Sequence, residues 1–326
     1  MTSARARTSP RLPGRAAATL AHGLEELRPG QSLELLKELH ILTSDGRINQ
    51  DSRRKLKQVL HLFRFIEKAL HELSPAVAAS DADAVASPGV TVVDHGAGKS
   101  YLGFILYDLY FRHLSTGWIY GVETRDELVL RSRALAMRLG FERMSFLNLS
   151  VQDATTTQHL PAQVDMVTAL HACDTATDDA IAFGLDKKAR CMVLVPCCQA
   201  ELARSLNAGK ALAIARTPLA ELWRHPLHTR EIGSQLTNVL RCLYLEAHGY
   251  QVTVTELVGW EHSMKNELIL ARFTGRFRLE SARRLSALLE QFGLQELLTT
   301  RYPLPHTVEQ HFALSSGATQ LRGSTP

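Results

Sequence analysis

Strand-like and helix-like segments alternate along the chain from residue 89 onward, and this alternation restricts the fold more than any other feature of the sequence. Short apolar runs rich in β-branched residues, VTVVD (90–94) and WIYGVE (118–123), are each followed by a longer segment with helical periodicity. Three similar runs come later in the chain: RMSFLNLSV, VDMVTALHA and ARCMVLVP. Strands that alternate with helices in this way predict an α/β fold built on a parallel sheet.

The last two predicted strands break this alternation. A long helical segment over about 230–247 leads into YQVTVTELV, and KNELILARF follows after only GWEHSM. A parallel connection needs roughly a dozen residues, so these two strands are predicted to form an antiparallel hairpin. The sheet is therefore expected to be mostly parallel and to end in a hairpin.

The N-terminal part of the chain carries an excess of positive charge. Residues 1–74 contain 13 Lys and Arg against 8 Asp and Glu, whereas residues 75–326 contain 24 against 25. Within this part, residues 1–15 hold four arginines and no acid, which predicts a disordered basic tail, and 16–74 are predicted to form a helical extension. Small and polar residues over 75–88 predict a linker.

One helical stretch in this extension, RRKLKQVLHLFRFIEKAL, combines an apolar stripe with a basic face. Lys57, His61, Arg64 and Lys68 recur at helical spacing beside the stripe. Such a face is either solvated or directed at phosphate groups, and the sequence leaves both interpretations open.

The overall composition, with 45% hydrophobic and 21% charged residues, is that of an ordinary globular protein. No run approaches the roughly 18–20 apolar residues of a membrane span, so no membrane partner is expected. The five cysteines are odd in number and unevenly spaced, unlike the disulfide framework of a secreted protein. We therefore expect a reducing, cytoplasmic location.

A glycine turn follows the first predicted strand in VVDHGAGKSYL, and an acid, Glu123, ends the second. Glycines at such a turn let a ligand approach backbone N–H groups, and a carboxylate is a bidentate acceptor suited to a diol. Together they predict a cleft for a dinucleotide or nucleoside. The third glycine of the NAD fingerprint is missing, and so is a phosphate loop with P-loop spacing.

These residues, with the closing hairpin, resemble motif I and the fold of class I S-adenosylmethionine-dependent methyltransferases. The resemblance covers about 89–274 and implies a doubly wound, mostly parallel seven-stranded sheet with a terminal antiparallel hairpin. Residues 275–326 are then expected to form a C-terminal helix and a loose tail. The helical segment over 16–74 is an N-terminal extension to this domain.

The resemblance also implies S-adenosylmethionine as the cofactor. Asp94 and the two glycines would line its methionine end, Glu123 would accept hydrogen bonds from both ribose hydroxyls, and Asp153 would meet the adenine amino group. The complete set of cofactor-binding residues implied in this way is Asp94, Gly96, Gly98, Glu123, Asp153 and Leu170.

A narrower resemblance lies in HACDTATDDA (171–180) and PCCQ (196–199). These motifs are similar to those of the tRNA 2′-O-methyltransferases that act on the acceptor stem and of related methyltransferase-like proteins. The chain departs from the tRNA enzymes because no cysteine precedes Cys173, so their N-terminal zinc-binding region has no counterpart. The Asn/Asp-Pro-Pro-aromatic motif of amino-group methyltransferases is also absent.

The polar residues of these two motifs follow the fourth and fifth strands and should converge beside the cofactor. In one interpretation His171 or Asp174 is a general base that deprotonates a hydroxyl. In a second, Cys197 or Cys173 is a thiolate nucleophile. A zinc site or simple tight packing are further alternatives for His171, Cys173, Cys197 and Cys198. The predicted catalytic set is His171, Asp174 and Cys197, without a metal.

We therefore expect an S-adenosylmethionine-dependent methyltransferase that acts on RNA, with a ribose 2′-hydroxyl as the acceptor. One alternative is a methyltransferase for a protein side chain or a small molecule. The other is a non-catalytic, cofactor-binding scaffold associated with RNA.

Overall fold

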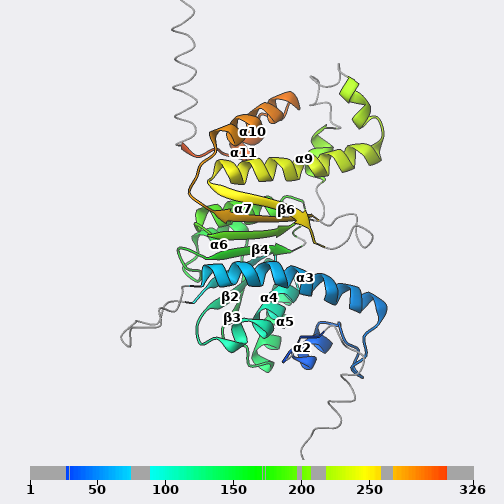
Figure 1. The fold of residues 1–326 in the computed structure, drawn as a ribbon, viewed down its shortest axis with the longest axis vertical. Helices are drawn as coiled ribbons and strands as arrows, with labels where there is room; N and C mark the ends of the chain where they lie inside the picture. Colours follow the sequence, from blue (N-terminus) through cyan, green and yellow to red (C-terminus); the bar gives the residue numbers. More distant parts are fainter. Residues whose placement is uncertain are drawn as a thin grey trace, which may run out of the picture. The chain divides into compact units, whose positions relative to one another are not determined.

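A computed structural model describes eight parts of the chain: residues 27–28, 30–74, 89–170, 172, 174–196, 200–206, 218–257 and 267–306 (Figure 1). The chain divides into two compact units, residues 1–60 and 61–326. The division falls inside the long helix α3 (Gln50–Leu73). The predicted linker over 75–88 lies outside the described residues, so the domain boundaries inferred from the sequence stay predictions.

The first unit contains the short helix α2 (Leu33–Glu38) and the first half of α3. Ser32 begins α2 because its hydroxyl accepts a hydrogen bond from the backbone N–H of Leu35 at 3.1 Å. The hydroxyl of Ser52 in α3 donates to the carbonyl of His40 at 3.2 Å, which ties α3 to the loop after α2.

The helix predicted over RRKLKQVLHLFRFIEKAL is confirmed as part of α3. Its apolar stripe is buried at Leu56, Phe63, Ile66 and Leu70. The side chains of the neighbouring basic face are exposed or half-buried: Lys57, His61, Arg64 and Lys68.

The second unit is built on one seven-stranded sheet in the order β3-β2-β1-β4-β5-β7-β6. The five strands from β3 to β5 are parallel, and β7 pairs antiparallel with both β5 and β6. The fold class predicted from the sequence is confirmed, including the terminal antiparallel hairpin. The strands are β1 (Thr91–His95), β2 (Trp118–Glu123), β3 (Met144–Asn148), β4 (Met166–Leu170), β5 (Cys191–Val195), β6 (Tyr250–Glu256) and β7 (Glu267–Phe273).

Helices connect the parallel strands. Those described in this unit are α4 (Tyr101–Leu109), α5 (Asp126–Arg138), α6 (Val151–Thr156), α7 (Ala176–Asp186), α8 (Glu201–Ser205), α9 (Pro226–Ala247), α10 (Leu279–Gln291) and α11 (Leu297–Thr300), with two 3₁₀ turns, η1 (Phe111–His113) and η4 (Pro218–Trp223). None of the described helices is long and apolar enough to span a membrane.

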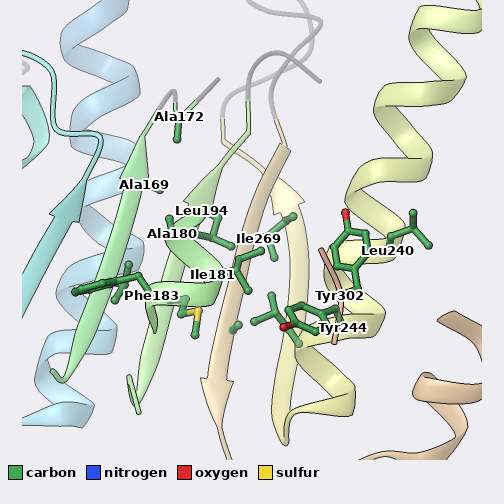
Figure 2. Close-up of a cluster of buried hydrophobic side chains, with 14 of the residues drawn as sticks. Ala169, Ala172, Ala180, Ile181, Phe183, Leu194, Leu240, Tyr244, Ile269 and Tyr302 are labelled. Atoms are coloured by element: carbon green, nitrogen blue, oxygen red, sulfur yellow. The ribbon is translucent and has the colours of Figure 1, made fainter. Parts of the chain in front are cut away.

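Helices cover both faces of the sheet, which is the doubly wound arrangement expected from the alternation of elements. On one face, α7 and α9 bury a cluster with the sheet, and Figure 2 shows Ile181 and Phe183 of α7 among its members with Leu240 and Tyr244 of α9. On the other face, Phe104 of α4 packs against Phe146 of β3 with ring centroids 5.5 Å apart. The carboxyl ends of the parallel strands therefore emerge between two helical layers.

Candidate active site

The glycine turn after β1 has a backbone conformation that favours glycine. Gly96 and Gly98 have φ of +66° and +58°, a region that side chains with a Cβ rarely adopt. A Cβ built on Gly96 would come no nearer than 4.0 Å to the Cβ of Ala172, and one on Gly98 would meet the Arg125 guanidinium at 3.7 Å. The positive φ angles explain why glycine occupies both positions, and they leave the backbone there without a side chain to cover it.

Glu123, the last residue of β2, is buried beside this turn. One carboxylate oxygen accepts the backbone N–H of Gly98 at 2.7 Å, and Arg125 donates to both oxygens from its guanidinium at 3.0 and 3.1 Å. Burial by itself would raise the pKa of Glu123, but the hydrogen bonds from Arg125 and Gly98 outweigh it and lower the pKa. Glu123 is therefore an ionised acceptor next to the glycines.

The Arg125 side chain is 67% exposed, so its hydrogen bonds to Glu123 are accessible to solvent. A ligand diol that bound to the Glu123 carboxylate would have to take the place of these guanidinium hydrogen bonds, because a carboxylate offers about four lone pairs. The exposed position of Arg125 makes such an exchange inexpensive.

Asp94, in β1, connects this strand to two neighbouring segments through its carboxylate. Its buried carboxylate accepts hydrogen bonds from the hydroxyls of Thr168 at 2.8 Å and Ser100 at 3.3 Å. Burial raises the pKa of Asp94 to about 6 against the opposing effect of these two hydroxyls. Asp94 thereby links β1 to β4 and to Ser100, which directly precedes α4.

His95, the last residue of β1, is a buried residue beside the glycine turn that the sequence analysis did not single out. Its ring is buried 5.6 Å from that of Phe183, and neither ring nitrogen has a hydrogen-bond partner among the described residues. Burial lowers the pKa of His95 to about 4, so the ring is neutral at physiological pH. Only its polar side chain at an apolar strand position distinguished it in the sequence.

Asp153 and Leu170 lie at the same edge of the sheet as the glycine turn. Asp153 is exposed in the first turn of α6, directly after β3, and accepts the Ser150 hydroxyl at 2.6 Å. Leu170 is the half-buried last residue of β4. Their contacts with a cofactor stay predictions.

Asp174 joins the ends of two strands. One carboxylate oxygen accepts the backbone N–H groups of Ala200 at 3.0 Å and Glu201 at 2.9 Å, and the other pairs with Arg204 at 2.8 Å. Burial by itself would raise the pKa of Asp174, but Arg204 and the two N–H groups outweigh it and lower the pKa. The loop after β4 is therefore fastened to the start of α8, which follows β5.

The backbone of Asp174 is itself held in an unusual conformation. Its φ is +51°, and its carbonyl accepts a hydrogen bond from the guanidinium of Arg241 at 2.8 Å. Arg241 is fully buried and also forms a two-pronged pair with Asp178, at 2.8 and 2.6 Å. Thr177, in the first turn of α7, donates its hydroxyl to the carbonyl of Ala172 at 2.7 Å. Three residues of the sequence motif DTATD thus have structural partners in this loop.

The remaining candidates for catalysis, His171, Cys173, Cys197 and Cys198, lie outside the described residues. Their neighbours in the chain, Ala172 and Asp174 after β4 and Pro196 after β5, belong to the described part. The described residues contain no group of three or more His, Cys, Asp and Glu side chains placed to hold a metal ion. The base, thiolate, zinc and packing interpretations of the four residues therefore all stay predictions.

The described residues at this edge of the sheet fit S-adenosylmethionine. The bare backbone at Gly96 and Gly98 suits a ligand that approaches N–H groups, and the ionised Glu123 suits a ribose diol. Both features come from the carboxyl ends of adjacent parallel strands, where ligands bind in open α/β sheets.

Comparison with known proteins agrees with this assignment. Residues 54–205 match the model of a family described as a methyltransferase domain. The match covers slightly under half of the chain and supports the prediction of a methyltransferase domain with S-adenosylmethionine as its cofactor. The order and directions of the strands are those of the class I methyltransferase architecture.

Curated relatives share part of this sequence. The chain is 23% identical over 203 residues to a glutathione S-transferase C-terminal domain-containing protein from Xenopus laevis, covering 57% of this chain and 31% of that protein. The protein of the same name from Bos taurus is 24% identical over 202 residues, covering 57% and 30%. The chain thus spans about a third of the length of the curated relatives it matches.

Solved structures with a related arrangement include a methyltransferase from Podospora anserina bound to S-adenosylhomocysteine, with a TM-score of 0.42, 12% identity and coverage of 82% of this chain and 100% of that one. A fibrillarin from Aeropyrum pernix with bound S-adenosylmethionine has a TM-score of 0.35, 14% identity and coverage of 56% and 66%.

Proposed function

We propose that this chain transfers the methyl group of S-adenosylmethionine to RNA, with a ribose 2′-hydroxyl as the acceptor. The observation that best supports the proposal concerns Asp174. Its carboxylate joins the loop after β4 to the segment after β5, at the same edge of the sheet as the glycine turn and Glu123. The motifs around 171–180 and 196–199, which resemble those of tRNA 2′-O-methyltransferases, begin in these two segments. We also propose a cytoplasmic location.

Bound S-adenosylmethionine supplies a methyl group that its sulfonium already activates. The chain's own residues mainly bind the cofactor, orient the acceptor and remove the acceptor's proton. Asp94, the two glycines, Glu123, Asp153 and Leu170 would hold the cofactor. His171 would accept the proton of the acceptor hydroxyl as that oxygen attacks the methyl carbon. Of the two predicted bases we favour His171, because three donors occupy the Asp174 carboxylate and lower its pKa.

Other acceptors fit the same architecture. A thiolate at Cys197 or Cys173 would favour transfer to a base carbon, and a protein side chain or small molecule remains the main alternative to RNA. A non-catalytic, RNA-associated scaffold would use the cofactor cleft without the base. The exposed face of Lys57, Arg64 and Lys68 on α3 supports RNA among these partners because it presents positive charge at helical spacing.

A methyl-transfer assay tests the proposal. The full chain is incubated with radiolabelled S-adenosylmethionine and, separately, with total RNA, total protein and a metabolite extract. We expect label in RNA, at a product that nuclease digestion and chromatography identify as a 2′-O-methylated nucleoside. Label only in protein or metabolites would contradict the RNA substrate, and no transfer to any pool, with the cofactor bound, would favour the scaffold.

A further inference from the structure

The segment that joins β7 to α10 is strongly basic in a part of the chain that is otherwise slightly acidic. Residues 272–284, RFTGRFRLESARR, contain five arginines and one acid, whereas residues 75–326 as a whole contain 24 basic and 25 acidic residues. Two phenylalanines alternate with the first arginines of the segment. Positive charge and aromatic rings are thus concentrated together in one short stretch.

Both rings are open to solvent. Phe273, the last residue of β7, is 49% exposed, and Phe277 is 51% exposed. All of the residues over 273–278 are exposed. Single exposed apolar residues are common on proteins, but a ring that lies between two exposed arginines offers a stacking face within a positive field.

The backbone of this segment is fixed by hydrogen bonds, so the exposed side chains project from a defined turn. The N–H and the hydroxyl of Thr274 both donate to the carbonyl of Gly249, at 2.9 and 3.0 Å. The N–H of Arg278 donates to the carbonyl of Glu246 at 3.3 Å. The Phe273 ring rests edge-on against Tyr250 with centroids 5.2 Å apart.

Part of the positive charge is not neutralised by neighbouring acids. Arg278 pairs with Glu246 and Arg284 with Glu280, each at 3.1 Å. Arg276 and Arg283 are exposed, and within the described ranges neither makes an ion pair. Their guanidinium groups can therefore bind phosphate without first breaking a salt bridge.

The segment lies at the edge of the sheet opposite the cofactor turn. Because β7 runs antiparallel to β5, its last residue meets the amino end of β5, and the N–H of Phe273 donates to the carbonyl of Arg190 at 2.9 Å. The glycine turn and Glu123 lie instead at the carboxyl ends of the parallel strands. A ligand at this segment would bind away from the reacting atoms.

We infer that Phe273, Arg276, Phe277 and Arg283, here called the arginine–phenylalanine surface, form a docking site for single-stranded RNA outside the active site. Arg276 and Arg283 bind phosphates, and Phe277 stacks on a base, the combination that sequence-independent single-strand binders use. The inference rests on the proposed RNA substrate. Exposed rings on a fixed turn, beside two arginines that make no ion pair within the described ranges, favour nucleic acid over a protein partner.

The experiment measures binding of a fluorescent, mixed-sequence, single-stranded RNA to the full chain over a series of salt concentrations. Each phosphate contact contributes about −0.7 to the slope of log K against log salt on single strands. We expect Arg276→Gln with Arg283→Gln to make the slope shallower by about 1.4. Phe277→Ala should weaken binding about fivefold or more while the slope stays the same, because it removes stacking and no charge. Affinity for S-adenosylmethionine should not change in either variant.

Arg131→Gln is the matched control, since Arg131 is an exposed arginine on α5 that pairs with Glu127. It should leave the slope and the affinity unchanged. If the parent binds RNA and the double variant keeps the parent slope, the arginine–phenylalanine surface is not an RNA site, whereas the proposed substrate stands. If the parent binds no RNA even at low salt, both the surface assignment and the RNA substrate are wrong.

Discussion

Replacing His171 by alanine is expected to lower kcat for methyl transfer to RNA by about 10²- to 10⁴-fold while the affinity for S-adenosylmethionine stays near that of the parent. A ribose hydroxyl is a poor nucleophile until its proton is removed, so the loss of a positioned base acts on the chemical step. Single-turnover kinetics with saturating cofactor, together with calorimetric titration of the cofactor, measure the two quantities separately.

Variants of Asp174 test whether this residue, and not His171, is the base. An asparagine oxygen can still accept the N–H groups of Ala200 and Glu201, but it cannot act as a base. If His171 is the base, Asp174→Asn should therefore keep kcat within about threefold of the parent. Asp174→Ala should lower kcat further, because the hydrogen bonds to these two N–H groups are lost. Equal, large losses of kcat in Asp174→Asn and Asp174→Ala, with a normal His171→Ala, would make Asp174 the base. Loss of cofactor binding in His171→Ala would instead give His171 a structural role.

Replacing Arg241 by methionine is expected to lower the free energy of unfolding by about 3–5 kcal/mol. The substitution leaves the carboxylate of Asp178 buried without its two-pronged partner, and it also removes the hydrogen bonds of Arg241 to the Asp174 carbonyl and to Asn238. Urea unfolding followed by circular dichroism measures the change, with the slope m as the check on two-state behaviour.

The matched control is Arg284→Met, because Arg284 pairs with Glu280 on the exposed face of α10. Exposed pairs contribute about 0–1 kcal/mol, so this variant should unfold almost like the parent. Adding Asp178→Leu to Arg241→Met should recover part of the lost stability, since no unpaired buried charge remains. A loss below about 1 kcal/mol in Arg241→Met would show that the buried pair does not hold the loop after β4.

Local sequence patterns were sufficient to predict the sheet. The run WIYGVE coincides with β2, and the short GWEHSM connection predicted the antiparallel pairing of β6 with β7. Helix α6 was missed, although Ser150-Val-Gln-Asp153 has the spacing of a helix-capping motif and the Ser150 hydroxyl does accept the Asp153 N–H. The capping signal overlaps the run RMSFLNLSV, whose apolar residues predict a strand, and the strand β3 ends at Asn148.

The interactions within the candidate site depend on residues far apart in the chain. Asp174 and Arg241 are 67 positions apart, and Asp174 and Glu201 are 27 apart, so no local pattern indicates that they meet. Asp94, Gly96, Gly98 and Glu123 could be proposed from the sequence because the glycine turn and the acid at the strand end resemble a known motif, and their contacts with a cofactor stay predictions. Only the tertiary structure shows that Asp174 joins the loop after β4 to the start of α8 and that His95 is a buried, neutral ring.

The most direct test of the account is calorimetric titration of S-adenosylmethionine into the full chain, together with Asp94→Ala, Glu123→Ala and the exposed-carboxylate control Glu127→Ala. We predict one cofactor per chain and a rise in Tm on binding, because a ligand that binds only the folded state stabilises it. Glu123→Ala and Asp94→Ala should each weaken binding at least tenfold, and Glu127→Ala should bind like the parent. A parent chain that takes up no S-adenosylmethionine, or Glu123 and Asp94 variants that bind it as the parent does, would contradict the assignment of the cleft.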